Sequence, residues 1–440
     1  MTFNIAVIGQ GFVGLSLSVV IASKNFLVFA IENDSKKLKK LKEGKVPFHE
    51  PKINLFLSKA IKRKKISFHK SIDNIHDLID IFFITVPTPA KKGKIDVQYL
   101  ESAIKEIIPN INKNSKKPII IIKSTIAPET TEKKIIPLLN KSTKKLGKDF
   151  FLAVNPEFLR EGYAIKDQLE PHVVVIGCQD KQTESNLNKF YKKMYQNHVK
   201  IFFTNYSTAE LIKYSNNAFL ATKISFINSI SNLCQKIPGA NIDDIAKVIG
   251  MDPRIGNLFL KAGPGFGGSC LPKDLDSLIT VLKEQKVNSS LFEGVKEVND
   301  EQIKIIVNTI KKKLKNLKGK TISVLGLAFK ENSDDIRNSK SISLIRILLE
   351  EKCKIQAYDP IAKSNSEKLF GKKVVFCNTI SECLQNTSGV IIMNSNSEYL
   401  EITDFIKGKT KNPLIIDTRR ILKNKDQKFY YALGINQVQK

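Results

Sequence analysis

The sequence predicts an α/β protein in which two parallel-sheet domains flank a helical middle. Three observations support this fold class. The chain starts with short apolar strands that alternate with helices, and a second pattern of the same kind starts near residue 321. Between them lies a long helical stretch from Ser207, followed by a glycine-rich loop at residues 263–268. The length of 440 residues is sufficient for two or three domains with ordinary cores.

The N-terminal strand runs directly into the glycine motif Gly9-Gln-Gly-Phe-Val-Gly14, and Glu32 ends the second strand. The pattern predicts a strand, a helix and a strand at residues 5–8, 15–23 and 27–31. This order provides a tight turn, space for a pyrophosphate at a helix N-terminus, and a carboxylate for the ribose 2′-OH. We therefore predict a Rossmann domain that binds a nicotinamide dinucleotide. Glu32 favours NAD over NADP, since a carboxylate repels a 2′-phosphate, although Lys37 weakens that preference.

Later strands of this domain also end in polar residues. The strands at 81–86, 118–122 and 151–154 are followed by Pro87-Thr-Pro89, Lys123-Ser-Thr125 and Asn155-Pro-Glu-Phe-Leu-Arg-Glu-Gly162. Each tail alone is typical of an ordinary turn. Because the carboxyl ends of parallel strands line the ligand crevice, their recurrence predicts one shared site. Strands at 173–176 and 200–203 complete the domain.

A capping box, Ser207-Thr-Ala-Glu210, starts a helix that continues to about Cys234. A helix this long between two α/β units could bridge domains or subunits. Lys213 and Asn217 are four residues apart and therefore share one face. From this spacing alone, a solvent-exposed lysine is the more common outcome.

The loop from Gly263 to Asp274 has four glycines within six residues and then a cysteine, Cys270. Such a loop turns sharply or lets a ligand approach the backbone closely. Lys273 follows, and a nearby cation favours a thiolate. The alternative is a turn that contains an ordinary buried cysteine. The context favours a nucleophile.

The second α/β pattern starts with a strand at 321–327, and further strands are expected near 354–358, 373–377, 389–393 and 413–417. Its first turn, Gly326-Leu-Ala-Phe-Lys330, lacks the glycine triad. We therefore do not expect this unit to hold a second dinucleotide in the same way.

The formal net charge is +28, but only seven of the 71 basic residues are arginines. The lysines are scattered, and no nucleic-acid-binding motif accompanies them, so we expect no nucleic-acid partner. The six cysteines form no CxxC or Cys/His cluster, which predicts neither a metal site nor disulfides and fits a cytoplasmic location. No apolar segment is long enough to span a membrane. In so arginine-poor a chain, each arginine marks a candidate site for bidentate recognition, and Arg160, Arg254 and Arg337 lie in motifs.

Together these motifs resemble the nucleotide-sugar dehydrogenases that oxidise UDP-glucose or GDP-mannose at C6, over essentially the whole chain. The residues that carry the resemblance are Gly9–Gly14, Lys123-Ser-Thr125, Asn155–Gly162, Glu210-Leu-Ile-Lys-Tyr-Ser-Asn-Asn-Ala-Phe-Leu220, Gly267-Gly-Ser-Cys-Leu-Pro-Lys-Asp274, and Leu327-Ala-Phe-Lys330 with Asp335-Ile-Arg337. The resemblance implies an NAD-binding Rossmann domain at 1–204 and a central helical domain at 205–300, which carries the catalytic loop and forms a homodimer through its long helix. It also implies a C-terminal Rossmann-like domain at 301–440 that binds the nucleotide sugar.

The resemblance further implies a four-electron oxidation. Cys270 would attack the aldehyde left by a first hydride transfer, a second transfer would give a thioester, and water would release the uronate. Other implied catalytic groups are Lys213 and Asn217 at the oxyanion, and Asp274, Thr125 and Glu157 for water and proton transfer. Implied NAD contacts are Gly9, Gly11, Phe12, Val13, Gly14, Glu32, Lys37, Thr88, Thr125, Glu161, Lys273 and Arg337. Implied sugar-nucleotide contacts are Glu157, Phe158, Leu159, Arg160, Glu161, Lys213, Asn217, Arg254, Phe259, Leu260, Gly263, Gly267 and Lys330.

The sugar is less well determined than the reaction. Met251–Gly256 and Phe259–Gly263 are more similar to the UDP-glucose enzymes, and GDP-mannose is the alternative. Ser269 argues against the UDP-N-acetylmannosamine branch, which resembles Gly-His-Cys there. Some positions depart from the family pattern: Glu32 replaces the usual Asp, Phe12 a common Tyr, and His172-Val173 a frequent Pro-x-Arg. A two-electron hydroxyacid dehydrogenase would not need Cys270, and a non-catalytic basic protein would leave the cysteine loop unexplained.

Overall fold

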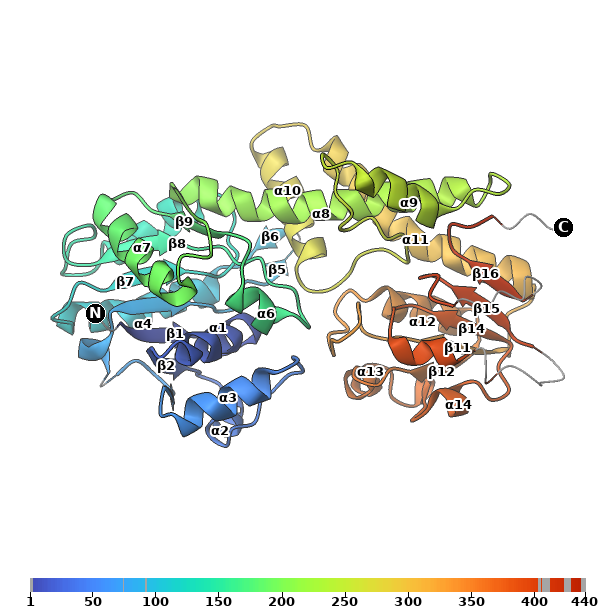
Figure 1. Cartoon of the computed structure of the whole chain (residues 1–440), viewed down its shortest axis with the longest axis horizontal. Coiled ribbons are helices and arrows are strands. Elements are labelled where there is room, and N and C mark those ends of the chain that lie inside the picture. Colours follow the sequence, from blue (N-terminus) through green and yellow to red (C-terminus); the bar gives the residue numbers. More distant parts are fainter. Residues whose placement is uncertain are drawn as a thin grey trace. The chain divides into compact units, whose positions relative to one another are not determined.

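The structure is a computed structural model that describes residues 3–73, 75–91, 93–402, 405, 412–422 and 429–436. It divides into two compact units, residues 1–216 and 217–440, each built on a mainly parallel sheet (Figure 1). The predicted α/β fold class is confirmed. Among the described residues, no helix has the length and apolar character needed to cross a membrane.

The first unit contains an eight-stranded sheet in the order β10-β9-β8-β7-β4-β1-β2-β3. All neighbouring strands pair in parallel except β8 and β9. The strands are β1 (Asn4–Ile8), β2 (Leu27–Ile31), β3 (Ile66–His69), β4 (Ile81–Ile84), β7 (Ile119–Ile122), β8 (Phe151–Val154), β9 (Val174–Gly177) and β10 (Ile201–Thr204); a small hairpin pairs β5 (Ala90–Lys91) with β6 (Lys94–Ile95). Chain order reverses at β1 and β4, where Rossmann sheets bind their ligands.

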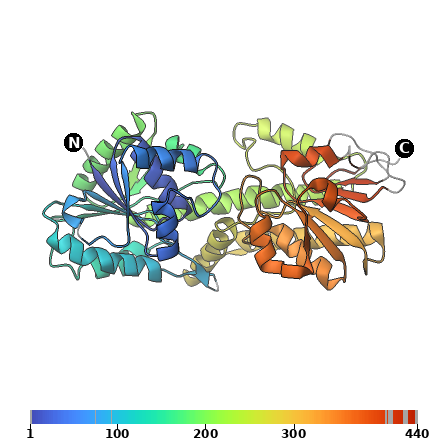
Figure 2. The same cartoon turned by 90° about the horizontal axis from the view of Figure 1, so that it is seen from below.

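Helices cover both faces of this sheet (Figure 2). The helices are α1 (Phe12–Ser23), α2 (Ser35–Lys42), α3 (Ile53–Lys62), α4 (Gln98–Lys113), α5 (Ile136–Leu139), α6 (Ala164–Leu169) and α7 (Lys181–Tyr195), with short turns η1 (His76–Leu78) and η2 (Thr131–Ile135). One core packs α1, α3 and α7 on the sheet, and the other packs α4 and α5. Because both faces are buried, strands such as Ile119–Ile122 are continuous apolar runs rather than alternating ones.

The long helix α8 (Tyr206–Cys234) starts one residue before the position expected from the capping box. It is one uninterrupted helix, and the division between the two units falls within it (Figure 1). Asn205 precedes it, and its side chain accepts a hydrogen bond from the Thr208 amide.

The second unit combines helices α9 (Ile242–Met251), α10 (Leu271–Glu284) and α11 (Ser290–Leu314) with a six-stranded parallel sheet in the order β13-β12-β11-β14-β15-β16. Its strands are β11 (Thr321–Leu325), β12 (Lys354–Tyr358), β13 (Val375–Phe376), β14 (Gly389–Ile392), β15 (Leu414–Asp417) and β16 (Tyr430–Ala432). Its other helices are α12 (Lys340–Glu350), α13 (Lys363–Phe370) and α14 (Ile380–Cys383), with short turns η3 (Gly371–Lys373) and η4 (Ser397–Glu401). The expected domain boundary at residue 300 falls inside α11.

Candidate active site

The glycine turn after β1 is shaped for close packing. Gly9 has a positive φ of 91°, and a Cβ on Gly14 would lie 1.8 Å from the carbonyl oxygen of Gly9. Helix α1 starts immediately afterwards at Phe12, so its free amide groups face this turn. Only glycine permits this combination, and it is the geometry in which a pyrophosphate can contact the backbone. These residues therefore fit a dinucleotide.

Glu32 follows β2 and lies beside the same turn. Its side chain is 5% exposed, and Oε2 accepts a hydrogen bond of 3.1 Å from the Gln10 amide. The Lys37 ammonium is 3.1 Å from the same oxygen. The structure thus brings together the acid and the lysine that the sequence assigned to the cofactor. This position matches that of the carboxylate that binds a ribose 2′-OH in Rossmann domains.

Polar groups gather at the carboxyl ends of β4, β7 and β8, as expected for a shared crevice. The Thr88 hydroxyl donates a 2.7 Å hydrogen bond to the carbonyl of Thr125. The Lys213 ammonium, from α8, donates to the Glu157 carbonyl at 2.6 Å and lies 3.0 Å from Glu157 Oε1. Both side chains are buried, at 4% and 7% exposure, so Lys213 does not take the solvent-exposed position that its spacing alone favoured.

This buried pair is strongly coupled through charge. Burial by itself would raise the pKa of the Glu157 carboxyl, but the charge of Lys213 and a backbone hydrogen bond from Leu159 bring that pKa below its ordinary value. Lys213 also lies 5.5 Å from the centre of the Phe158 ring. A buried ammonium held by a carboxylate and an aromatic ring is positioned to stabilise negative charge on a bound substrate.

Lys123 is a third member of this cluster, and no role was predicted for it from the sequence. Its ammonium donates a 2.8 Å hydrogen bond to Asn155 Oδ1, which also accepts one from the Tyr191 hydroxyl. Burial lowers the pKa of Lys123 to about 8; the charge of Glu157 opposes this change, and the charge of Lys213 contributes to it.

Cys270 occupies the N-cap position of α10, directly after the glycine loop. Its thiol is partly exposed, and the Ser269 hydroxyl lies 3.6 Å from its sulfur. The positive end of a helix dipole favours an anionic sulfur. The sequence predicted a reactive setting from the adjacent lysine, and the helix N-terminus adds a second favourable charge.

Asp274 lies in the first turn of α10 and is 1% exposed. The Asn217 amide donates a 2.6 Å hydrogen bond to Oδ2, and the Lys273 ammonium donates a 2.7 Å hydrogen bond to Oδ1. Both carboxylate oxygens therefore have fixed donors. Asn217 is one helical turn beyond Lys213 on α8, so neighbouring positions of one helix supply both groups.

The glycine loop is held by contacts within its own unit. A Cβ on Gly263 would lie 2.5 Å from the guanidinium of Arg419, and one on Gly268 would lie 2.9 Å from the Phe329 ring. Gly268 also has a positive φ of 82°. These glycines were expected to permit a close approach to the backbone, and side chains of the protein itself make such an approach.

The three motif arginines are all exposed and paired with a nearby aspartate. Arg160 pairs with Asp167, Arg254 with Asp252 and Arg337 with Asp335, in each case at 2.6–2.7 Å.

Of the remaining predicted contacts, Leu260 is buried, Lys330 lies 5.6 Å from the centre of the Phe329 ring, and Phe259 has a left-handed backbone with a φ of 65°.

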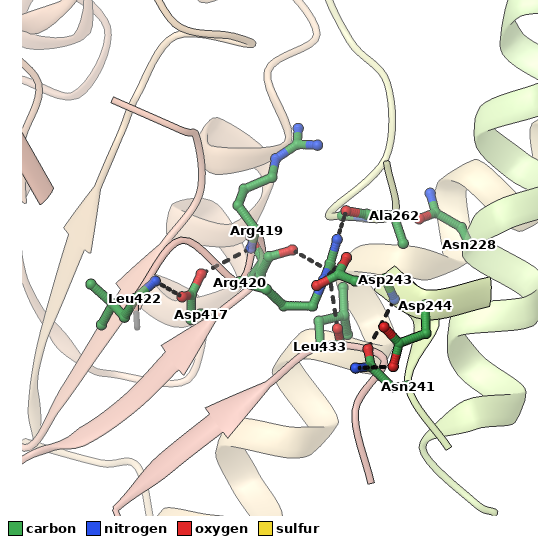
Figure 3. A network of polar contacts seen from close by, with 12 residues as sticks. Asn228, Asn241, Asp243, Asp244, Ala262, Asp417, Arg419, Arg420, Leu422 and Leu433 are labelled. Atoms are coloured by element: carbon green, nitrogen blue, oxygen red, sulfur yellow. Dashed lines mark hydrogen bonds and ion pairs between the residues drawn. The ribbon is translucent and has the colours of Figure 1, made fainter. Parts of the chain in front are cut away.

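Two half-buried arginines, Arg419 and Arg420, were counted in the sequence but were given no role there. They follow β15, and Figure 3 shows their side chains pointing in different directions. Burial lowers the pKa of Arg419 to about 10. The side chain of Arg420 is 4% exposed. The sequence feature that could have indicated these two residues is an adjacent pair of arginines at a strand end in an arginine-poor chain.

Glu50 is a further buried residue without a predicted role. Its carboxylate accepts hydrogen bonds of 2.7 Å from the Gly162 amide and 2.8 Å from the Ala164 amide. It thereby ties the segment before β3 to the loop that contains Glu161. Among the described residues, no group of His, Cys, Asp or Glu side chains is arranged to hold a metal ion.

Comparison with known proteins gives a consistent result. Three domain models of one family match: the NAD binding domain of the UDP-glucose/GDP-mannose dehydrogenase family at residues 3–195, its central domain at 207–301 and its UDP binding domain at 323–424. The UDP-glucose 6-dehydrogenase of Rickettsia bellii is 38% identical over 439 residues, which cover 98% of this chain and 99% of that protein. TuaD, a UDP-glucose 6-dehydrogenase of Bacillus subtilis, is 36% identical over 98% of this chain and 93% of its own.

A solved structure shares the fold over nearly the full length. The UDP-glucose dehydrogenase from the archaeon Pyrobaculum islandicum superposes with a TM-score of 0.90 at 29% identity, covering 99% of this chain and 98% of that one.

Proposed function

The chain belongs to the UDP-glucose/GDP-mannose dehydrogenase family, and we propose that it oxidises UDP-glucose at C6 with NAD as the hydride acceptor. This membership confirms the resemblance predicted from the motifs. Close relatives over the full length are named for UDP-glucose, so GDP-mannose is not the favoured substrate. The three family domains agree with the proposed division at 1–204, 205–300 and 301–440 in number and order.

The observation that carries this proposal is Cys270 at the start of α10, with Asp274 held by two donors one turn further on. An alcohol cannot become a carboxylate in one hydride step, so a nucleophile must hold the aldehyde between two steps. In our proposal the Cys270 sulfur adds to the aldehyde carbon, giving a thiohemiacetal. Loss of a second hydride gives a thioester, and water then releases the carboxylate and the free thiol.

The buried groups of the first unit have separate proposed roles. NAD, when bound, accepts hydride, and the Gly9–Gly14 turn and Glu32 would hold its pyrophosphate and ribose. Lys213 would stabilise the developing alkoxide of the substrate, since its ammonium is already desolvated and needs little reorganisation. Glu157, ion-paired with Lys213, would keep that ammonium in place.

The reaction is tested by counting NADH per sugar with limiting UDP-glucose and excess NAD, with GDP-mannose in parallel. We expect two NADH per UDP-glucose and none above background from GDP-mannose. Two NADH from GDP-mannose alone would change the substrate and keep the mechanism. One NADH per sugar would contradict the thioester mechanism.

The nucleophile is tested with a Cys270→Ser variant. We expect at most one NADH per UDP-glucose, because the aldehyde cannot form a thioester. Cys178→Ser is the matched control, since Cys178 is also a partly exposed free thiol. It should still yield two NADH. Full turnover by Cys270→Ser would favour a mechanism without a covalent intermediate.

We also propose that the protein is a homodimer that works in the cytoplasm. The support for a dimer is a row of exposed apolar side chains on α8: Phe219, Phe226 and Leu233 are 65%, 51% and 52% exposed at intervals of seven residues. Apolar residues at this spacing line one face of a helix and favour pairing with another apolar surface. The support for a reducing compartment is that all six cysteines are free thiols.

A further inference from the structure

Arg420, which follows β15, forms hydrogen bonds with three other segments of the second unit. Its Nε donates a 2.8 Å hydrogen bond to Asp243 Oδ1 on α9, and Nη1 donates to the Leu433 carbonyl at 3.0 Å, after β16. Its Nη2 donates a 2.9 Å hydrogen bond to the carbonyl of Ala262, in the segment that leads to the glycine loop (Figure 3). A planar guanidinium can satisfy these directions at once, whereas an ammonium cannot.

The same peptide bond is held from its other side by α8. The amide of Gly263 donates a 2.8 Å hydrogen bond to Asn228 Oδ1. The Ala262 carbonyl and the Gly263 amide belong to one peptide group, so Arg420 and Asn228 together fix its position and orientation. Asn228 is fully buried, and among the described residues its Nδ2 has no hydrogen-bond partner. We call this arrangement the peptide clamp.

The backbone around the clamp is strained. Phe259 and Arg420 both have left-handed backbones, with φ of 65° and 56°. Such conformations are unfavourable in side-chain-bearing residues and persist only where the surroundings determine them, commonly at functional sites. Phe259 lies three residues before the clamped peptide, in the segment that the family resemblance implies to contact the sugar nucleotide.

We propose that Arg420 is a positioning residue for the sugar part of the substrate: it holds the Ala262–Gly263 peptide against Asn228 and thereby sets the shape of the segment from Phe259 to Gly263. Arg420 does not contact the substrate in this role. It acts through the loop backbone, and Asp243 orients it. This inference rests on the proposed function, because it assumes that this segment faces a nucleotide sugar.

The test is the binding of UDP-glucose, UDP and NAD to the wild type and to Arg420→Lys by calorimetry. We expect the Kd for UDP-glucose to rise about tenfold and the Kd for UDP to rise less than threefold, because UDP lacks the sugar. The Kd for NAD should stay within twofold. Arg346→Lys is the control, since Arg346 is an exposed arginine on α12 in the same unit. It should change none of the three constants.

A double-mutant cycle tests whether Arg420 acts by positioning the Ala262–Gly263 peptide or only by stabilising the fold. Asn228→Ala removes the other half of the clamp, and the combined variant should weaken UDP-glucose binding little more than either single change. Additive losses, or equal losses for UDP and UDP-glucose, would overturn the proposal. So would a lower melting temperature with unchanged UDP-glucose affinity.

Asp243→Asn keeps the proposal testable if Arg420→Lys does not fold. Asp243 is 53% exposed, and this change removes only the carboxylate charge beside Nε. We expect the Kd for UDP-glucose to rise about threefold, and an unchanged value would then overturn the proposal. A wild-type protein that binds NAD but no UDP-glucose would contradict the proposed function itself.

Discussion

Lys123 shows how burial alone changes the chemistry of one side chain. Its pKa is lowered to about 8, and its ammonium donates a hydrogen bond to the neutral side-chain amide of Asn155. The sequence presents it as one residue of a Lys-Ser-Thr tail, and nothing in 71 basic residues distinguishes it. Its character depends on Glu157 and Lys213, which lie 34 and 90 positions further along the chain.

This pKa predicts how stability depends on pH. Between about pH 8 and 10.5 the unfolded chain keeps a proton on Lys123 that the folded protein has released, so the free energy of unfolding rises with pH in this window. A Lys123→Met variant lacks this contribution. We expect the difference in unfolding free energy, wild type minus variant, to increase by about 2 kcal/mol from pH 7.5 to pH 10. Urea unfolding at several pH values measures it.

Lys117→Met is the control for this prediction, because Lys117 is an exposed lysine of the same unit, just before β7. Its difference from the wild type should be flat over the same pH range. A Lys123→Met difference that is also flat, or that decreases with pH, would show that Lys123 is not buried as described.

The arginines show what residue-level reasoning could and could not predict. Their scarcity led us to predict special roles for the three arginines in motifs, and these three are exposed and paired with aspartates two or seven residues away. The side chain of Arg420 is 4% exposed and has long-range contacts, with partners Asp243 and Ala262 that are 177 and 158 residues away. A contact of that range leaves no local pattern in the sequence.

At the level of elements, the α6 helix depends on a residue far from it in sequence. Its first turn and the preceding Gly162 donate amide hydrogen bonds to the buried Glu50 carboxylate. Helix N-termini leave amides without partners, and this carboxylate satisfies the amide of Ala164, the first residue of α6, together with the amide of Gly162 just before the helix. Glu50 therefore fixes the position of Glu161, which is adjacent to Gly162 in the chain.

A Glu50→Gln change is expected to lower the free energy of unfolding by about 2–3 kcal/mol, since one side-chain oxygen becomes an amide nitrogen that cannot accept. We also expect the KM for NAD to rise several-fold, because the loop before α6 loses its anchor. Glu43→Gln, at an exposed surface pair, should leave the free energy of unfolding unchanged. Equal stability of the two variants would show that Glu50 is not an anchor.

The order of helices and strands could be predicted from the sequence more accurately than the contacts between their side chains. The glycine triad, the polar strand tails and the capping box predicted the Rossmann order and placed α8 within one residue of its start. The glycine loop was expected to turn sharply or to let a ligand approach its backbone, and within the protein two of its glycines lie close to Arg419 and Phe329. Local patterns report backbone conformation, whereas the identity of a packing partner depends on the tertiary fold.

At the scale of the whole molecule, the proposed dimer predicts a mass. The chain is 49.5 kDa, so light scattering coupled to gel filtration should give about twice this value for the wild type. Phe226 lies at the centre of the exposed row on α8 and is 51% exposed. A Phe226→Asp change places a charge where an apolar partner surface is expected, and desolvating an unpaired carboxylate is unfavourable. We expect the variant to elute with the mass of one chain.

Leu55→Asp provides the matched control, because Leu55 on α3 is an apolar side chain of the same exposure, 50%, outside the row on α8. It should remain a dimer. A monomeric wild type would contradict pairing through this helix. So would dimers that persist both in the Phe226→Asp variant and in a variant changed at Phe219. Because Phe226 has no role in the proposed chemistry, NADH production per chain by the monomeric variant then measures whether each chain needs its partner.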